Sequence, residues 1–279
     1  MPPVDIEATV LANVRLSRDY SVLSLAAPAI GDATAPGQFM MVKAGRSTDP
    51  LLRRPFSVFE VLRDERGATT GVSLLNKRAG RSTDRLYHVD RGDVVSCLGP
   101  LGRPFTLPPA GTEAWMVAGG VGLAPFATLA EALASSGVPT TLFYGARTGA
   151  ELFYLDFFER LGVHIVLSTE DGSRGLTGRV TTPLEEALRE LKEGRKQGAA
   201  GTTSAVVYAC GPEPMLAAVA GLAERYGQPS QVSVERVMGC GLGGCYSCVI
   251  KVRHGDEHAH LVRSCLNGPV FDGAELVWD

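Results

Sequence analysis

Short runs of hydrophobic and polar residues in alternation fill the first hundred positions, and turn residues separate these runs. Such a period of two is typical of half-buried strands, so the pattern predicts a small antiparallel barrel up to about Pro109. A linker at 107–111, which contains two prolines and a glycine, is predicted to follow the barrel. The predicted strands are 22–25, 39–42, 56–62, 71–75 and 94–98.

After residue 110 the pattern changes, because continuous apolar runs alternate with stretches of helical period. This alternation predicts a parallel sheet covered by helices on both faces. The predicted strands are 114–118, 140–144, 164–168 and 205–209, and the predicted helices are 125–135, 152–161, 183–194 and 215–226. From about Gln228 turns and cysteines dominate. We therefore expect a β-barrel domain at 1–109, an α/β domain at 110–228 and a small module at 229–279.

Composition narrows the class of protein. The 279 residues are 45% hydrophobic and 20% charged, which excludes a disordered chain. With 27 Lys and Arg against 30 Asp and Glu, the net charge of −3 argues against a nucleic acid or an anionic membrane as partner. The N-terminus lacks the pattern of a signal peptide, and the apolar window at 114–130 is shorter than the ~20 residues of a membrane helix. We expect a soluble, cytoplasmic protein.

Four cysteines crowd the last forty residues. Cys240, Cys245 and Cys248 have the spacing C-x4-C-x2-C, and Cys265 follows 17 positions later. This is the plant-type spacing of a [2Fe–2S] cluster, in which thiolates converge on two irons. The glycines between the cysteines allow the loop to curl around such a cluster. The alternative is a structural zinc site, although zinc ligands usually come as two closely spaced cysteine pairs.

A glycine-rich turn follows the first predicted strand of the parallel sheet. Gly119, Gly120 and Gly122 precede Pro125, which suits a first helical turn. Backbone amides and the helix start at such a turn can bind a nucleotide diphosphate. The alternative is a tight turn that binds nothing.

A second turn, Cys210-Gly211-Pro212, follows the last predicted strand of the same unit. Both turns then lie at the carboxyl edge of the sheet, where ligands bind in such folds. A cleft formed by two turns favours a dinucleotide site, with Cys210 beside it. A small buried thiol is the other interpretation of Cys210.

The sequence Arg54-Pro55-Phe56-Ser57 lies in the predicted barrel. An arginine and a hydroxyl on either side of a fixed turn can bind a phosphate or a ring carbonyl. An arginine in a surface ion pair is the alternative.

Taken in this order, the motifs resemble those of the ferredoxin-reductase superfamily, in which a barrel binds flavin and an α/β domain binds NAD(P). More narrowly, the chain is similar to the electron-transfer subunits of two-subunit, NAD-dependent dihydroorotate dehydrogenases. The narrower resemblance rests on the C-terminal position of the cysteines and on the sequences at 235–248 and 265–271. It covers the chain from about Ile6 to Val277.

The resemblance implies roles for individual residues. Arg54, Pro55, Phe56 and Ser57 match the family's first FAD motif. A second flavin-contacting strand corresponds to Leu75, Asn76 and Lys77, although an aromatic residue is common where this chain has Asn76. Ser82 and Thr83 take the place of a Gly-Thr pair that meets the FAD pyrophosphate, so Ser82 also departs from the family pattern.

The resemblance also implies a path for electrons. Dihydroorotate is oxidised on the FMN of a separate catalytic subunit, and electrons pass through the [2Fe–2S] cluster and FAD to NAD+. A heterotetramer with two copies of each subunit is implied as well. No catalytic residue is expected in this chain, which contains no recognisable triad or carboxylate pair. The sequence leaves NAD and NADP open, because Arg147 after the second strand could pair with a 2′-phosphate.

Two other functions fit parts of the pattern. Flavin and iron–sulfur subunits of sulfhydrogenase or bifurcating transhydrogenase complexes share this layout but serve other partners. A zinc-stapled nucleotide-binding module without flavin would be a protein of a different class.

Overall fold

The computed structural model describes residues 2–45, 48–194, 204–253, 255 and 258–278. The chain forms two compact units. Unit 1 comprises residues up to Pro104 together with Arg236–Val249 and Arg263–Pro269. Unit 2 comprises Phe105–Glu235, Ile250–Val262 and the residues from Val270 onward.

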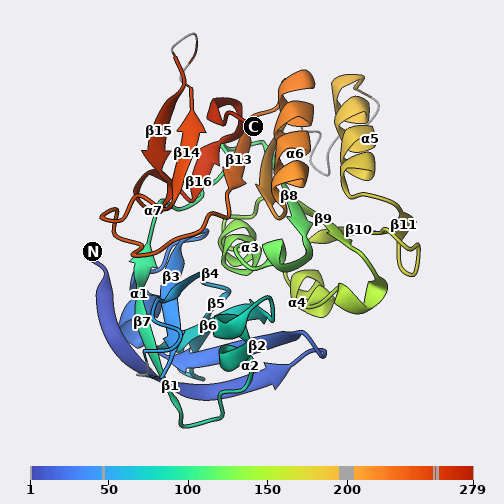
Figure 1. The fold of residues 1–279 in the computed structure, drawn as a ribbon. Helices are drawn as coiled ribbons and strands as arrows, with labels where there is room; N and C mark the ends of the chain where they lie inside the picture. Colours follow the sequence, from blue (N-terminus) through green and yellow to red (C-terminus); the bar gives the residue numbers. More distant parts are fainter. Residues whose placement is uncertain (1, 46–47, 195–203, 254, 256–257, 279) are drawn as a thin grey trace. The chain divides into compact units, whose positions relative to one another are not determined.

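Unit 1 contains an antiparallel sheet with the strand order β4-β3-β7-β1-β2-β6-β5 (Figure 1). Its edge strands β4 and β5 follow one another in the chain, separated only by Val58 and Phe59. The Val58 amide donates to the Gln38 carbonyl (3.0 Å) and the Phe59 amide to the Ser73 carbonyl (2.9 Å), which closes the sheet into a barrel. The elements are β1 (Val4–Arg15), β2 (Tyr20–Ala26), α1 (Pro28–Ala33), β3 (Phe39–Ala44), β4 (Arg54–Ser57), β5 (Glu60–Arg63), β6 (Thr69–Lys77), α2 (Arg81–Tyr87) and β7 (Val94–Leu101).

The barrel interior is apolar because alternate side chains of its strands point inward. Leu23 and Leu25 of β2 are fully buried, and so are Val72 and Leu74 of β6. Burial of one such side chain contributes about 1.5–3 kcal/mol to stability. These contacts fix the pairing register, since a one-residue slip would turn the apolar face outward.

Unit 2 contains a sheet with the strand order β11-β10-β9-β8-β12-β13-β16. The strands are parallel except for β16, which pairs antiparallel with β13. The sheet strands are β8 (Glu113–Gly119), β9 (Thr140–Ala146), β10 (His164–Thr169), β11 (Leu176–Thr177), β12 (Ala205–Cys210), β13 (Ser230–Ser233) and β16 (Val270–Asp272).

Helices α5 and α6 lie side by side in unit 2 (Figure 1). One core cluster joins these two helices to Trp115 and Val117 of β8 and to Phe143 of β9. The helices of unit 2 are η1 (Gly120–Leu123), α3 (Phe126–Ser135), η2 (Gly149–Glu151), α4 (Leu155–Arg160), α5 (Thr181–Lys192), α6 (Glu213–Arg225) and η3 (Gly273–Glu275). The remaining elements are β14 (Val249–Val252), β15 (His260–Arg263) and α7 (Ser264–Asn267), where β14 and β15 pair with each other.

The predicted barrel and the predicted parallel sheet are both confirmed, with two corrections. The run predicted as one strand at 56–62 is two strands, because the chain passes from one edge of the barrel to the other at Val58 and Phe59. The sheet of unit 2 is mixed and not purely parallel, because β16 joins its edge in the opposite direction.

The residues predicted to form a third module are divided between the two units. The cysteine-bearing segments belong to unit 1, whereas β13 and β16 extend the sheet of unit 2. The division at 109 and 228 therefore stays a prediction about function and does not coincide with the compact units. Among the described residues, no helix is both long and apolar enough to cross a membrane.

Candidate functional site

The four clustered cysteines all belong to unit 1. Cys240, Cys245 and Cys248 lie between β13 and β14, and Cys265 lies in α7. Cys245 is exposed, whereas Cys248 and Cys265 are only 2% and 1% exposed. The buried pair packs with the apolar side chains Phe39, Met41, Leu98, Leu101 and Met238. The loop is thus anchored on the barrel, and its exposed end carries Cys245.

Glycines let this loop pack closely. Gly241 and Gly243 have φ angles of +73° and +82°, which L side chains rarely adopt. A Cβ atom on Gly241 would also lie 2.6 Å from Cγ of Met41. Tyr246 has a φ of +58°, although it is not a glycine. Backbone strain of this kind costs about 1–3 kcal/mol and is concentrated at functional sites.

Hydrogen bonds surround the sulfur atoms. The Leu242 amide donates to Sγ of Cys240 (3.4 Å). The Ser247 hydroxyl accepts the Gly239 amide (2.9 Å) and lies 3.1 Å from Sγ of Cys245. Such donors stabilise thiolate sulfur and are the kind that tune iron–sulfur clusters.

The sulfur atoms group into two neighbouring pairs. Cys245 lies within hydrogen-bonding reach of Cys240, and Ser247 lowers the pKa of Cys245 to about 6. Cys265 lies within reach of Cys248, and its pKa is raised to about 12, first by burial and then by the Cys248 sulfur. In the described part of the chain, no three His, Cys, Asp or Glu side chains are arranged around one metal ion. Two cysteine pairs fit the two irons of a [2Fe–2S] cluster.

The side chain of Arg263 contacts the cysteine loop at two points. Nη1 of Arg263 donates to the Gly243 carbonyl (2.8 Å), and its guanidinium lies 4.7 Å from the ring centroid of Tyr246. The amide of Ser264 donates to the Cys248 carbonyl (2.9 Å), which ties α7 to the loop. Arg263 gives no signal in the sequence apart from its position two residues before Cys265, so it was not predicted.

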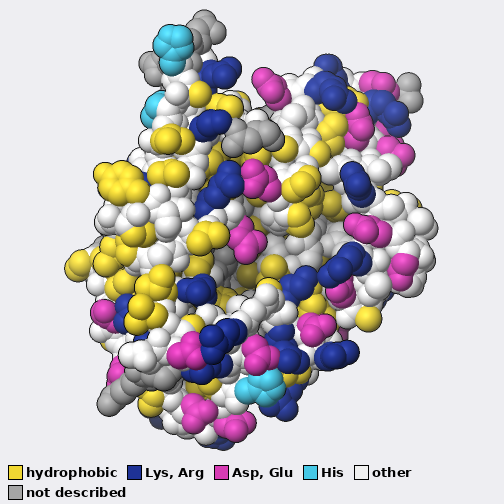
Figure 2. Space-filling view, in the orientation of Figure 1, with side chains coloured by type: hydrophobic (Ala, Val, Ile, Leu, Met, Phe, Trp, Pro, Cys, Tyr) yellow, Lys and Arg dark blue, Asp and Glu magenta, His cyan; other side chains and the backbone are white. Residues whose placement is uncertain are grey.

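Exposed apolar side chains lie in this loop and next to Cys265, and we call them the exposed apolar patch. It consists of Val237, Leu242, Tyr246 and Leu266, which are 82%, 53%, 61% and 44% exposed. Figure 2 shows hydrophobic side chains gathered on the side where Figure 1 places α7. Clustered exposed side chains of this kind mark interaction surfaces.

The predicted FAD segments lie in one part of unit 1. Strand β4, which carries Arg54, Pro55, Phe56 and Ser57, is half-buried and contacts β6. Helix α2, which carries Ser82 and Thr83, packs against β6 as well. On β6, Leu75 and Asn76 are buried and Lys77 is half-buried.

The two neighbouring arginines differ in their partners. Arg53 forms an ion pair with Asp5, with Nη2 and Oδ1 2.5 Å apart, and donates to the Ser96 hydroxyl (2.8 Å). Arg54 contacts no carboxylate in the described part of the chain, and its Nη1 donates only to the carbonyls of Leu52 and Arg53 (3.1 Å each). The positive charge of Arg54 is therefore available to an anionic ligand such as a flavin dinucleotide.

Asn76 and Thr83 also form hydrogen bonds within the protein itself, which the sequence does not indicate. Nδ2 of Asn76 donates to the Thr83 carbonyl (3.0 Å), while its buried Oδ1 has no partner among the described residues. The Thr83 hydroxyl accepts the amides of Ala79 (2.8 Å) and Gly80 (3.1 Å). Thr83 thus caps its own helix, whereas Asn76 offers an acceptor that a ligand N–H could fill. The predicted FAD contacts fit these positions and stay predictions.

The two predicted dinucleotide turns meet at one point of unit 2. Strands β8 and β12 are neighbours, and the chain builds the sheet outward from β8 in one direction and from β12 in the other. Ligands bind at such a switch point, beyond the carboxyl ends of the strands. The predicted residues there are Gly119, Gly120, Gly122 and Pro125 after β8, and Cys210, Gly211 and Pro212 at the end of β12.

The glycines at these turns are also required by the protein's own packing. A Cβ on Gly122 would overlap the carbonyl of Cys210, and one on Gly119 would lie 2.7 Å from Sδ of Met215. Gly120 has a φ of +55°. Close approach of a ligand is therefore not the sole reason for glycine here.

Cys210 is a poorly acidic thiol. Burial raises its pKa to about 12, and the nearby charge of Glu235 acts in the same direction. The thiol is thus protonated at neutral pH, which suits a structural side chain beside the two turns and not a nucleophile.

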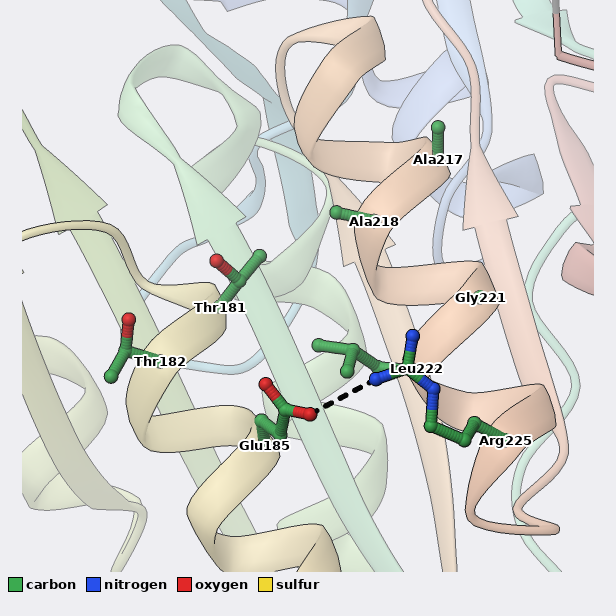
Figure 3. Close-up of a pocket in the computed structure, with 8 residues that line it drawn as sticks. All are labelled: Thr181, Thr182, Glu185, Ala217, Ala218, Gly221, Leu222 and Arg225. Atoms are coloured by element: carbon green, nitrogen blue, oxygen red, sulfur yellow. Dashed lines mark hydrogen bonds and ion pairs between the residues drawn. The ribbon is translucent and has the colours of Figure 1, made fainter.

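A groove of about 400 Å³ lies between α5 and α6 (Figure 3). Glu185 of α5 faces Arg225 of α6, with Oε1 and Nη1 3.1 Å apart. The groove contains none of the predicted site residues. Its lining residues are Thr181, Thr182, Glu185, Ala217, Ala218, Gly221, Leu222 and Arg225.

Two family models match the chain. The iron–sulfur cluster binding domain of dihydroorotate dehydrogenase B matches residues 235–277, and the oxidoreductase NAD-binding domain matches residues 116–221. The first match covers all four clustered cysteines, and the second covers the turn at Gly119–Pro125.

Curated relatives match almost end to end. One from Desulforamulus reducens is 35% identical over 274 residues, covering 98% of each chain. One from Bacillus caldolyticus is 38% identical over 277 residues, covering 97% of this chain and 98% of the relative. Both are named dihydroorotate dehydrogenase B (NAD(+)), electron transfer subunit.

A solved structure has the same fold. A chain from a structure of NADH-dependent reduced ferredoxin-NADP oxidoreductase, described for flavin-based electron bifurcation, aligns with a TM-score of 0.80. It is 26% identical, and the match covers 97% of this chain and 90% of the other.

Proposed function

Because this chain belongs to the family of dihydroorotate dehydrogenase B electron transfer subunits, we propose that it connects dihydroorotate oxidation on a partner subunit to reduction of NAD+. Cofactors of this family are FAD, a [2Fe–2S] cluster and NAD. When bound, FAD exchanges single electrons with an iron–sulfur centre and a hydride with a nicotinamide. The chain's own residues bind and orient these groups.

The set of four cysteines carries this proposal. Cys248 and Cys265 are buried against the barrel and Cys245 is exposed, so one end of the set faces solvent. A cluster held there is insulated by apolar side chains on one side and open to a redox partner on the other. A non-catalytic, zinc-stapled module would need no flavin segment and no open end.

Residues of both units hold the other groups. In unit 1, Arg54 supplies a positive charge free for a flavin phosphate, and Asn76 supplies a buried acceptor. In unit 2, the turns after β8 and β12 present backbone amides to the NAD diphosphate at the switch point.

The partner is the catalytic subunit of the same dehydrogenase, which we infer to contain FMN. It docks on the exposed apolar patch, because that patch shares a loop with the one exposed cysteine of the set. We propose an assembly of two copies of each subunit in the cytoplasm, with neither nucleic acid nor membrane as a partner. Within the chain, 1–109, 110–228 and 229–279 act as the flavin, NAD and cluster modules.

A visible spectrum tests the proposal. The chain is purified without oxygen and measured before and after addition of NADH. Flavin and iron–sulfur bands that bleach together support it. A protein that lacks flavin and contains zinc, even after reconstitution with iron, sulfide and FAD, would refute it.

Substitution of one proposed cluster-ligating cysteine tests the same proposal. Cys248→Ser is expected to lose the cluster absorbance and electron exchange with the partner, while flavin reduction by NADH remains. Cys97→Ser is the matched control, because Cys97 is buried inside the barrel, away from the cluster loop. Full iron content in Cys248→Ser would show that the ligand assignment is wrong.

A second candidate is the small subunit of a bifurcating or sulfhydrogenase complex. The TM-score of 0.80 to a chain of the ferredoxin-NADP oxidoreductase favours it. The two functions differ in the partner that reduces the chain. Bleaching by dihydroorotate in the presence of a dihydroorotate dehydrogenase catalytic subunit supports the first candidate. Bleaching only with a ferredoxin-linked complex supports the second.

A further inference from the structure

An arginine and a glutamate meet at the turn after β9. Arg147 follows the last residue of the strand, and η2 brings Glu151 back toward it. Nη2 of Arg147 lies 3.6 Å from Oε1 of Glu151. Because β9 is parallel to its neighbour β8, this turn lies at the same edge as the proposed diphosphate site.

These two side chains have opposite effects on a dinucleotide. At the end of the second strand of such a unit, a carboxylate accepts a hydrogen bond from the ribose 2′-hydroxyl of NAD, whereas an arginine pairs with the 2′-phosphate of NADP. We propose that Glu151 neutralises Arg147 and thereby sets the preference of this chain for NAD over NADP. This inference rests on the proposed function, since it specifies the substrate of the same site.

The turn is held in place by its neighbours. The buried Tyr144 donates its hydroxyl to the Glu151 carbonyl (3.2 Å). The Gly149 amide donates to the Ser173 hydroxyl (2.7 Å). The Glu151 side chain is only 25% exposed, compared with 68% for Arg147. The carboxylate is therefore the more buried of the two groups, and the arginine is the side chain that a ligand can reach.

The charges near this turn also favour NAD over NADP. The loop after β10 meets the turn, because the Asp171 amide donates to the Arg147 carbonyl (3.2 Å). Hydrogen bonds from Ser173 lower the pKa of Asp171, so that carboxylate is charged at neutral pH. The segments 147–151 and 170–178 together contain Arg147 and Arg174 against Glu151, Glu170 and Asp171, which gives two positive and three negative charges. A 2′-phosphate adds nearly two more negative charges, whereas the ribose of NAD adds none.

Binding of NADH and NADPH to the holoprotein tests the inference. Glu151→Gln keeps the size of the side chain and removes its charge. We expect the ratio of the NADPH to the NADH dissociation constant to fall about tenfold at low ionic strength, and less at high salt, because exposed charges are screened. Adding Arg147→Ala to this variant is expected to abolish the gain in NADPH affinity.

Controls separate this inference from the proposed function. Glu186→Gln removes one exposed negative charge on α5 and is expected to leave the ratio unchanged. A wild-type chain that binds neither dinucleotide would refute the proposed function. An unchanged ratio in Glu151→Gln would overturn the inference alone. A wild type that prefers NADPH would overturn the inference and would also contradict the choice of NAD+ in the proposed function.

Discussion

Gly122 lies directly against the main-chain carbonyl of Cys210, so that the turns after β8 and β12 touch through their backbones. A side chain at position 122 would have to push these two strands' ends apart. A larger side chain at position 122 is therefore expected to destabilise unit 2 itself, whether or not a ligand is bound. Of the two interpretations that the sequence left open, ligand binding and a tight turn, the packing of Gly122 supports at least the second.

Gly122→Ala is accordingly expected to lower the free energy of unfolding by about 1–3 kcal/mol, since overpacking a tight contact costs that much. NADH affinity should fall in parallel. Thermal unfolding and NADH titration of the same samples measure both effects. Loss of NADH binding with unchanged stability would contradict the packing explanation.

Gly221→Ala provides the matched control in α6. A Cβ there meets nothing within 4 Å, and alanine favours helix by about 1 kcal/mol over glycine. This variant should gain stability and bind NADH as the wild type does.

Ser247→Ala is expected to lower the midpoint reduction potential of the cluster. The Ser247 oxygen already accepts the Gly239 amide, so its own proton is free to donate to Cys245. A hydrogen bond of about 1–1.5 kcal/mol that favours the more negative, reduced state corresponds to about 50 mV. Redox titration followed by visible spectra measures the shift. Ser247→Thr keeps the hydroxyl and should keep the potential.

Arg54→Ala is expected to weaken FAD binding about tenfold to a hundredfold, the value of a charge-assisted hydrogen bond. FAD titration of the deflavinated protein, followed by flavin fluorescence, measures the change. Arg53→Ala should instead lower thermal stability, because Arg53 pairs with Asp5, and leave FAD affinity nearly unchanged. Equal FAD affinity in wild type and Arg54→Ala would remove Arg54 from the site.

Cys210 is expected to resist alkylation in the folded protein. With a pKa of about 12, its thiolate fraction at pH 8 is about 10⁻⁴, roughly a thousandfold below that of a free cysteine. Because the folded pKa lies above the free value, the rate should rise about tenfold per pH unit throughout the neutral range. Iodoacetamide pulses with peptide mass spectrometry measure this rate. Labelling as fast in the native state as in urea would contradict the burial of this thiol.

Local patterns predicted much of the fold, because the central strands of both sheets are short apolar runs bounded by turn residues. The same patterns missed β1, whose alternation is interrupted by the bulge between Val10 and Ala12. They also missed β13 and β16, which are too short to show a period.

The candidate sites, too, were predictable where their residues are close together in the sequence and not where they are far apart. Cysteine spacing is local and predicted all four members of the candidate cluster set. The packing of Cys248 on Met41 and Leu98 joins residues about 150 to 200 positions apart, which no local pattern reveals. The difference between Arg53 and Arg54 depends on Asp5 from another strand, so the sequence predicted a role for Arg54 without showing what its neighbour Arg53 binds. The Arg147–Glu151 pair is local, but it depends on the turn η2, which the sequence pattern did not predict.

The interleaving of the C-terminal residues between the units limits how this gene can be shortened. Ending translation at residue 228 would strip β13 and β16 from one sheet and uncover Phe39, Met41 and Leu101 in the other unit. Both remaining units would then expose surfaces prone to aggregation. A flavin–nicotinamide reductase without its cluster is therefore better obtained by replacing the cysteines than by deleting the segment that carries them.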